Sequence, residues 1–221
     1  MTKKPETQRH TRYIVTEGPL GVGKTSLTTL LAEELGARLV LERAEDNPFL
    51  TDFYKDSARY RFQTQMFFLL NRYSQQEEMT QPDLFTRITI SDYLFAKDRI
   101  FAYLNLNEHE LSLYEQIYKM LEPKIVRPDL VIFLQADTDT LLRRIKQRGR
   151  SFEKDINTDY IAAVNEAYNQ YFFHYSETPL LVINTSDIDF VHRREDLDDL
   201  LKQVLGMKQG TQYYVPVSRG R

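Results

Sequence analysis

The sequence has 221 residues, of which 42% are hydrophobic and 28% are charged, so it predicts one folded domain and excludes wholesale disorder. A formal net charge of −3 is unlike that of a protein that binds duplex nucleic acid, and the lack of cysteine excludes disulfides and a thiolate zinc site. No apolar run approaches the roughly 20 residues that cross a bilayer. We therefore expect a cytoplasmic protein with no membrane or nucleic-acid partner.

Strands and helices alternate along the chain. β-rich runs predict five strands, at Arg12–Glu17, Ala37–Glu42, Phe85–Ile90, Leu130–Leu134 and Leu180–Ile183. Apolar residues at steps of three and four predict helices at Lys24–Leu35, Ala58–Glu78, Tyr93–Leu104, Glu108–Leu121, Asp139–Gln147, Asp159–Tyr175 and Glu195–Leu205, and Asn47-Pro48 starts a further short helix. This order predicts an α/β fold, a five-stranded parallel sheet with helices on both faces.

We expect one domain over residues 1–206, with a lid at about 144–156. Residues 207–221 contain Gly, Ser and Pro, three basic residues and no acid, and we interpret them as a mobile tail. Docking of Tyr213, Tyr214 and Val215 is the alternative. Asp137 follows the fourth predicted strand, and we expect it to cap the next helix rather than to hold a metal ion.

The most specific motif is a glycine-rich run between the first predicted strand and the first predicted helix. Gly18-Pro19-Leu20-Gly21-Val22-Gly23-Lys24-Thr25 fits G-x-x-x-x-G-K-S/T, the phosphate loop of nucleotide-binding proteins. Its backbone N–H groups and the following helix N-terminus attract phosphate, Lys24 reaches the β- and γ-phosphates, and Thr25 offers a hydroxyl to Mg²⁺. The predicted ATP-binding residues of this segment are Gly18, Gly21, Val22, Gly23, Lys24, Thr25 and Ser26.

A carboxylate ends the second predicted strand. In a doubly wound sheet Glu42 lies beside the phosphate loop, where it can take a proton from an acceptor hydroxyl that attacks the γ-phosphate. From spacing alone, an ordinary exposed glutamate at a strand end is an equally good interpretation.

Beyond these motifs the chain resembles the deoxynucleoside kinases over about residues 12–205. The matching segments are Glu42, Asn47-Pro48-Phe49-Leu50, Phe53-Tyr54-Lys55-Asp56, Gln65 with Phe68, Leu69 and Arg72, Arg144-Ile145-Lys146-Gln147-Arg148-Gly149-Arg150-Ser151-Phe152-Glu153, and Asp159-Tyr160 with Tyr168, Tyr171, Phe172 and Tyr175. The chain looks most similar to the bacterial branch that phosphorylates deoxyadenosine and deoxyguanosine. The resemblance implies a nucleoside kinase of the phosphate-loop fold, Mg·ATP-dependent transfer to a 5′-hydroxyl in nucleotide salvage, and a homodimer.

The resemblance also implies roles on the acceptor side. Glu42 matches the general base, and Tyr54 and Glu153 match the pair that binds the sugar 3′-hydroxyl. Gln65 matches the amide that reads the base, and Arg72 matches a position that selects bases together with a carboxylate. The implied substrate-binding residues are Tyr54, Gln65, Phe68, Arg72, Asp98, Phe101 and Glu153. A neutral nucleoside does need an amide for its base edge and aromatic walls for its faces, although each residue alone also fits an ordinary core or surface position.

On the donor side, Arg144, Arg148 and Arg150 match lid arginines that close over the ATP phosphates. Several guanidiniums suit a transition state that spreads charge over three oxygens, whereas a solvated charged face is the structural alternative. The resemblance thus implies a catalytic set of Glu42, Lys24, Arg144 and Arg148 and adds Arg150 to the ATP site.

One segment departs from the family pattern. Where the family has Glu-Arg-Ser after the third strand, this chain has Ile90-Ser91-Asp92-Tyr93-Leu94. Asp92 is then the candidate partner of Thr25 at Mg²⁺, and Lys97 or Arg99 are candidates for the missing arginine. Asp98 is the candidate partner of Arg72, which would favour purines or cytosine over thymine.

Two other functions remain open from the sequence. A nucleoside monophosphate kinase of the same fold would need an arginine near Glu42 for its anionic acceptor. The neighbouring Arg43 would point to the opposite face of the strand, so Arg59, Arg61 and Arg72 are the candidates. A nucleotide-binding subunit without catalysis would explain the missing Glu-Arg-Ser. The base is also open, because the amide of Gln65 can serve adenine, guanine or cytosine.

Overall fold

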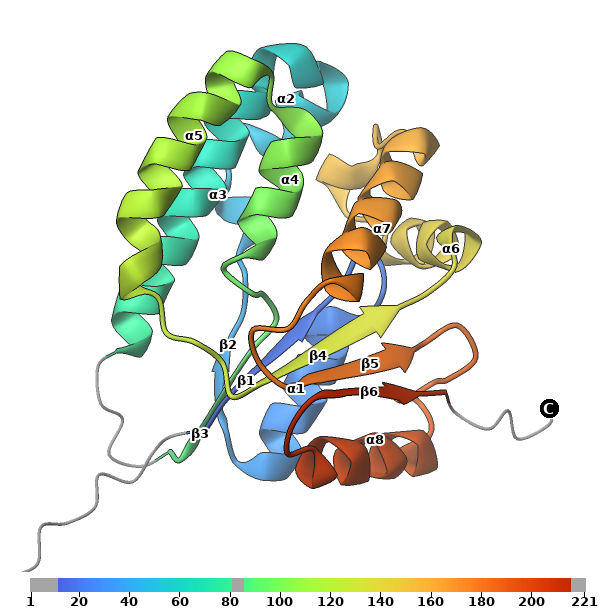
Figure 1. Ribbon diagram of the computed structural model, residues 1–221. Helices are drawn as coiled ribbons and strands as arrows, with labels where there is room; N and C mark the ends of the chain where they lie inside the picture. Colours follow the sequence, from blue (N-terminus) through green and yellow to red (C-terminus); the bar gives the residue numbers. More distant parts are fainter. Residues whose placement is uncertain (1–11, 81–85, 216–221) are drawn as a thin grey trace, which may run out of the picture.

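The computed structural model describes residues 12–80 and 86–215. Its centre is a parallel sheet of six strands in the order β2-β3-β1-β4-β5-β6 (Figure 1). The strands are β1 (Arg12–Glu17), β2 (Arg38–Val40), β3 (Ile88–Ser91), β4 (Leu130–Gln135), β5 (Leu180–Asn184) and β6 (Thr211–Tyr214). The chain winds first to one side of β1 and later to the other, so the loop after β1 lies at the switch point where such sheets bind ligands.

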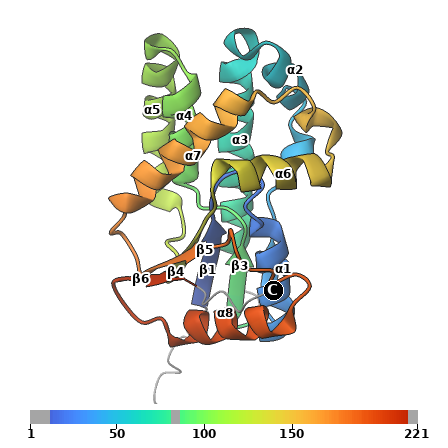
Figure 2. The ribbon, with the colours of Figure 1, turned by 90° about the vertical axis from the view of Figure 1, so that its right-hand side faces the viewer.

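Helices cover both faces of this sheet, as predicted. They are α1 (Lys24–Leu35), α2 (Leu50–Lys55), α3 (Ser57–Met79), α4 (Lys97–Asn105), α5 (Glu108–Leu121), α6 (Thr138–Arg148), α7 (Thr158–Phe173) and α8 (Arg194–Gly206), with 3₁₀ turns η1 (Ala44–Asp46), η2 (Glu122–Lys124) and η3 (Ser151–Glu153). Helices α1 and α8 lie on one face of the sheet, and α4 and α7 on the other (Figures 1 and 2). Alternate strand residues face opposite ways, so Ile14 packs with α1 and α8, whereas Tyr13 and Val15 pack with α4 and α7. Helices α3 and α5 pack against α4 around Leu69, Tyr114 and Tyr118.

The sheet has one strand more than the sequence predicts. The sixth strand, β6, lies in the segment that we expected to be a mobile tail. It pairs in parallel with β5 from Leu180 and Thr211 to Ile183 and Tyr214, because α8 returns the chain to the edge of the sheet and Met207 is buried against the core. The expectation of mobility is therefore wrong for residues 211–214, and the end of the predicted tail, residues 216–221, lies outside the described residues.

Two smaller expectations concern single elements. Asp137 caps α6, since its Oδ1 accepts a hydrogen bond of 2.7 Å from the backbone N–H of Thr140, which confirms the predicted cap. Helix α4 begins at Lys97, four residues later than predicted, because residues 92–94 form a bonded loop after β3. Within the described ranges, no helix has the length and apolar character needed to cross a lipid bilayer.

Candidate active site

A cleft of about 1160 Å³ opens beyond the carboxyl ends of β1, β2 and β3. Seventeen of the predicted site residues line it: Gly21, Val22, Gly23, Lys24, Thr25, Ser26, Glu42, Tyr54, Gln65, Phe68, Arg72, Asp92, Phe101, Arg144, Arg148, Arg150 and Glu153. The other two predicted residues, Gly18 and Asp98, lie behind its wall. Gly18 packs on the backbone of β4, and Asp98 is fully buried behind Gln65 and Arg72.

The phosphate loop joins β1 to α1 in a conformation that only glycine tolerates. Gly21 has a φ of 80°, and a Cβ there would lie 2.8 Å from the carbonyl oxygen of Leu141 in α6. Lys24 begins α1 and donates from Nζ to the carbonyl oxygens of Gly18, at 2.5 Å, and Pro19, at 3.1 Å. Burial lowers the pKa of Lys24 to about 8. The loop thus presents a buried cation and a helix N-terminus to the cleft.

A hydroxyl–carboxylate pair stands next to this loop. The Thr25 hydroxyl donates to Asp92 Oδ2 at 2.6 Å, and Asp92 Oδ1 accepts from the backbone N–H of Glu42 at 2.7 Å. Burial raises the pKa of Asp92. Asp92 therefore ties together α1, the end of β3 and the segment after β2, and it offers hard oxygen donors beside the phosphate loop.

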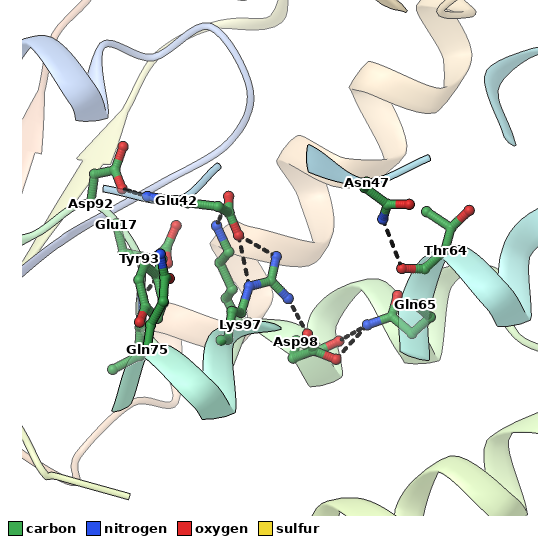
Figure 3. A network of polar contacts seen from close by, with 12 residues as sticks. Glu17, Glu42, Asn47, Thr64, Gln65, Gln75, Asp92, Tyr93, Lys97 and Asp98 are labelled. Atoms are coloured by element: carbon green, nitrogen blue, oxygen red, sulfur yellow. Dashed lines mark hydrogen bonds and ion pairs between the residues drawn. The ribbon is translucent and has the colours of Figure 1, made fainter. Parts of the chain in front are cut away.

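Glu42 is held by two buried cations (Figure 3). Arg72 Nε donates to Glu42 Oε1 at 2.7 Å, and Lys97 Nζ donates to Glu42 Oε2 at 2.7 Å. Burial of the carboxylate raises its pKa, but the charges of Arg72 and Lys97 prevail and lower it to about 2. Of the two candidates for the missing arginine, Lys97 is in the cleft, whereas Arg99 pairs with Glu115 on the far side of α4.

Further hydrogen bonds connect Glu42 and Arg72 to Gln65, the residue expected to bind the base edge. Arg72 Nη1 donates to Asp98 Oδ2, so the pair suggested by spacing is present. Gln65 Nε2 donates to the backbone oxygen of Asp98 at 2.9 Å and to its Oδ1 at 2.5 Å (Figure 3). Asp98 can only accept hydrogen bonds at these two oxygens, so the amide of Gln65 must turn its nitrogen toward Asp98. The oxygen of the Gln65 amide is then left for another partner. Arg72 also lies over the ring of Phe68, 4.8 Å from its centroid.

The predicted lid arginines take three different positions. Arg144 lies within α6 and donates to the carbonyl oxygens of Val22, at 3.2 Å, and Thr185, at 2.7 Å, so it braces the phosphate loop against the end of β5. Arg148 ends α6 and donates from Nη2 to Glu153 Oε1 at 2.5 Å. Arg150 lies in the turn after α6, with its guanidinium 5.7 Å from the ring centroid of Phe152.

Aromatic side chains form the remaining walls. Tyr54 packs edge-on against Tyr160, with centroids 6.3 Å apart, and burial raises its pKa. Phe101 packs edge-on against Tyr168, with centroids 5.9 Å apart. Asn105 donates to the hydroxyl of Tyr160 at 3.2 Å. Tyr160 and Asn105 line the cleft, and their roles were not predicted from the sequence.

The sequence also left Glu17 unassigned. This fully buried carboxylate accepts hydrogen bonds from the backbone N–H groups of Gly18, at 2.9 Å, and Leu94, at 2.7 Å, and from the hydroxyl of Tyr168, at 3.2 Å. It joins the phosphate loop, the loop after β3 and α7. A charged residue at the end of a strand, directly before the glycine motif, was the available signal.

Comparisons with known proteins find a matching family, similar sequences and a similar fold. The sequence model of a family described as deoxynucleoside kinase matches residues 14–207. A deoxyguanosine kinase of Bacillus subtilis is 37% identical over 87% of this chain and 95% of its own length, and a deoxyadenosine kinase of Lactobacillus acidophilus is 34% identical over 87% and 94%. The structure of a deoxyadenosine kinase from M. mycoides with bound dCTP superposes with a TM-score of 0.75 at 24% identity, covering 88% of this chain and 99% of that chain.

Proposed function

Because the chain belongs to the deoxynucleoside kinase family, we propose that its cleft transfers the γ-phosphoryl group of ATP to the 5′-hydroxyl of a purine deoxynucleoside or deoxycytidine. The observation that carries the proposal is one continuous cleft that holds a phosphate loop and Glu42 together. The similarity to proteins named deoxyguanosine kinase and deoxyadenosine kinase supports the choice of a purine deoxynucleoside as acceptor.

Glu42 is the proposed general base. Since the 5′-hydroxyl becomes far more acidic as its oxygen bonds to phosphorus, a carboxylate with a low pKa suffices to accept the hydroxyl proton as that bond forms. A monophosphate acceptor is disfavoured, because Arg72 and Lys97, the cations on Glu42, are already neutralised by carboxylates. An incoming phosphate would be repelled by Glu42.

We assign the donor phosphates to Lys24, the backbone of the phosphate loop and the arginines of α6. Thr25 and Asp92 would hold Mg²⁺, whose charge, once bound, offsets that of the phosphates. The described residues contain no cluster of three or more metal-binding side chains, so phosphate oxygens and water would complete the coordination.

We assign the nucleoside to the other end of the cleft. Tyr54 and Glu153 would bind the 3′-hydroxyl, and Phe68 and Phe101 would flank the base. Because Asp98 holds the Gln65 amide nitrogen, the Gln65 oxygen would accept a hydrogen bond from an N–H group on the base edge.

We also propose that the protein is a cytoplasmic homodimer. Tyr103 on α4 is 57% exposed and Phe173 on α7 is 77% exposed, and these two helices pack together. Exposed aromatic side chains of this size are typical of an interface. The absence of cysteine fits a reducing compartment. Analytical ultracentrifugation of the wild type and of a Phe173→Ser variant tests this proposal. The molecular mass in solution should be twice the chain mass for the wild type and lower for the variant.

A phosphoryl-transfer panel tests the reaction. Purified protein with Mg·ATP would receive deoxyadenosine, deoxyguanosine, deoxycytidine, thymidine, their ribose forms and the deoxynucleoside monophosphates. The proposal expects turnover of purine deoxynucleosides or deoxycytidine, a large loss of kcat in Glu42→Gln, and unchanged ATP binding by that variant. Turnover of monophosphates alone would contradict it.

A further inference from the structure

A lysine is buried in the acceptor wall of the cleft. Lys97 is the first residue of α4 and is 2% exposed, yet it lines the cleft and places Nζ 2.7 Å from Glu42 Oε2. A buried ammonium costs free energy unless it is paired, and an apolar side chain of similar length would fill the same space without that cost. The charge of Lys97 therefore calls for an explanation other than packing.

Lys97 differs from the other cations of the cleft in how it is held. Arg72 is shared by Glu42 and Asp98, Arg144 is bound to backbone carbonyls, and Arg148 is paired with Glu153. Among the contacts of the described residues, the ammonium of Lys97 has one partner, Glu42. Of these cations, Lys97 alone depends entirely on the group that we assign as the base.

Lys97 is also connected to the donor side of the cleft through its partner Glu42, whose backbone N–H donates to Asp92 Oδ1 at 2.7 Å. Burial is the main reason that the pKa of Lys24 is lowered, and the positive charge of Lys97 adds to that effect. Asp92 Oδ2 in turn accepts from the hydroxyl of Thr25 at 2.6 Å. A chain of contacts thus runs from the ammonium through Glu42 and Asp92 to the first turn of α1.

We propose that Lys97 is a catalytic residue, which exchanges Glu42 for the oxygens of the transferred phosphoryl group in the transition state. The inference rests on the proposed function of Glu42. The segment after β3 lacks the arginine of the Glu-Arg-Ser pattern, and Lys97, the first residue of α4, would supply a positive charge in its place.

The charges of the step favour this exchange. The 5′-oxygen forms a bond to the γ-phosphorus while the bond from phosphorus to the β,γ-bridging oxygen breaks, and its electron pair leaves with ADP. The hydroxyl proton passes to the carboxylate of Glu42, which becomes neutral. Lys97 then loses its charged partner as anionic phosphoryl oxygens arrive beside it, and a charged donor aimed at these oxygens stabilises the transition state.

The test compares Lys97→Met with Lys97→Arg, and Lys119→Met in the exposed part of α5 is the matched control. We expect Lys97→Met to lower kcat by about 100-fold or more, with little change in the dissociation constants of ATP and of the deoxynucleoside. Lys97→Arg should restore part of kcat, and Lys119→Met should match the wild type. Lys97→Met should also bind ADP with aluminium fluoride and deoxynucleoside at least tenfold more weakly, while it binds ADP alone normally.

Each other outcome has a distinct meaning. A kcat for Lys97→Met within about threefold of the wild type, while Glu42→Gln is impaired, would overturn the role of Lys97 and leave the base intact. A rise in KM alone, or no gain in Lys97→Arg, would also overturn it. Full activity of Glu42→Gln would instead refute the assignment of Glu42 as the general base, on which the role of Lys97 rests. If Lys97→Met does not fold, Lys97→Gln takes its place under the same criteria.

Discussion

The hydroxyl of Thr25 and the carboxylate of Asp92 are 2.6 Å apart. This contact links the first turn of α1 to the end of β3, two elements that are more than sixty residues apart in sequence. It also brings together the two side chains that we assign to Mg²⁺, so one side-chain pair connects the phosphate loop directly to the segment that follows β3.

The first prediction follows from this pair. Asp92→Asn keeps the shape of the side chain but removes its charge, so the Mg²⁺ concentration for half-maximal activity should rise by about tenfold or more. A magnesium titration of the initial rate measures this change. Asp137→Asn, which alters a helix cap outside the cleft, is the control. An equal magnesium requirement for wild type and Asp92→Asn would exclude Asp92 as a ligand.

The second prediction concerns the base. Asp98→Asn places an amide where Arg72 and Gln65 both donate, so it should lower the free energy of unfolding by about 1–3 kcal/mol. It should also let the amide of Gln65 rotate, which would narrow the difference in kcat/KM between the preferred base and the others. Urea unfolding and the substrate panel measure the two effects. Asp159→Asn, at an exposed position in α7, should change neither, and an unchanged base ranking in Asp98→Asn would count against the orienting role.

The third prediction is a pH dependence of stability. Burial opposes ionisation of Glu42, but Arg72 and Lys97 bring its pKa down to about 2 from a usual 4.5. A pKa that is lower in the folded state stabilises the protein above the unfolded pKa, and that contribution disappears as pH falls toward the folded value. Two other carboxylates lie close by: Asp92 accepts from the backbone of Glu42, and Asp98 lies on the far side of Arg72. Both are present in the wild type and in Glu42→Gln, so the difference in stability between these two proteins reports Glu42.

The wild type should therefore exceed Glu42→Gln in free energy of unfolding by a constant amount between pH 7 and 5. The difference should shrink by about 1–3 kcal/mol below pH 4.5. Denaturant unfolding at several pH values measures it, with the exposed Glu45→Gln as control. A difference that already shrinks between pH 7 and 5.5 would mean that the two cations do not hold the carboxylate ionised.

The fourth prediction concerns the ion pair between Arg148 and Glu153. Glu153 is 7% exposed, and its carboxylate is available to a 3′-hydroxyl and to Arg148. Glu153→Gln should raise KM for the deoxynucleoside about tenfold or more, and KM for ATP should rise less. Initial rates at varied concentrations of each substrate separate these effects. Glu166→Gln on the exposed face of α7 should behave as the wild type, and an equal rise of both KM values in Glu153→Gln would point to a general loosening of the lid.

Much of this arrangement could be predicted because it depends on local sequence. Gly21 and Lys24 sit in a motif whose spacing defines a loop conformation, and alternating strands and helices restrict the topology to few choices. The strand ends then place Glu42 beside that loop. The seven-residue spacing of Gln65 and Arg72 also predicts that both lie on one face of a helix.

The remaining features depend on tertiary contacts. The role of Glu17 in joining the phosphate loop to other elements is visible only in the folded structure, because its partners Leu94 and Tyr168 are far away in sequence. The choice between Lys97 and Arg99 depends on how α4 is rotated against α3, and a two-residue spacing cannot reveal that rotation. β6 is a short strand that needs the exposed edge of β5, so its own residues carry little signal.

The position of β1 within the sheet has a consequence for synthesis on the ribosome. β1 leaves the ribosome before both of its neighbours, since it pairs with β3 from Arg12 and Ile88, and with β4 from Ile14 and Leu130. Neither neighbour exists until far more of the chain has left the exit tunnel, so the phosphate loop cannot settle early against a finished sheet. Contacts of such long sequence separation slow folding. The phosphate loop is therefore synthesised before the strands that support it, and Tyr13, Ile14 and Val15 must avoid wrong contacts until those strands arrive.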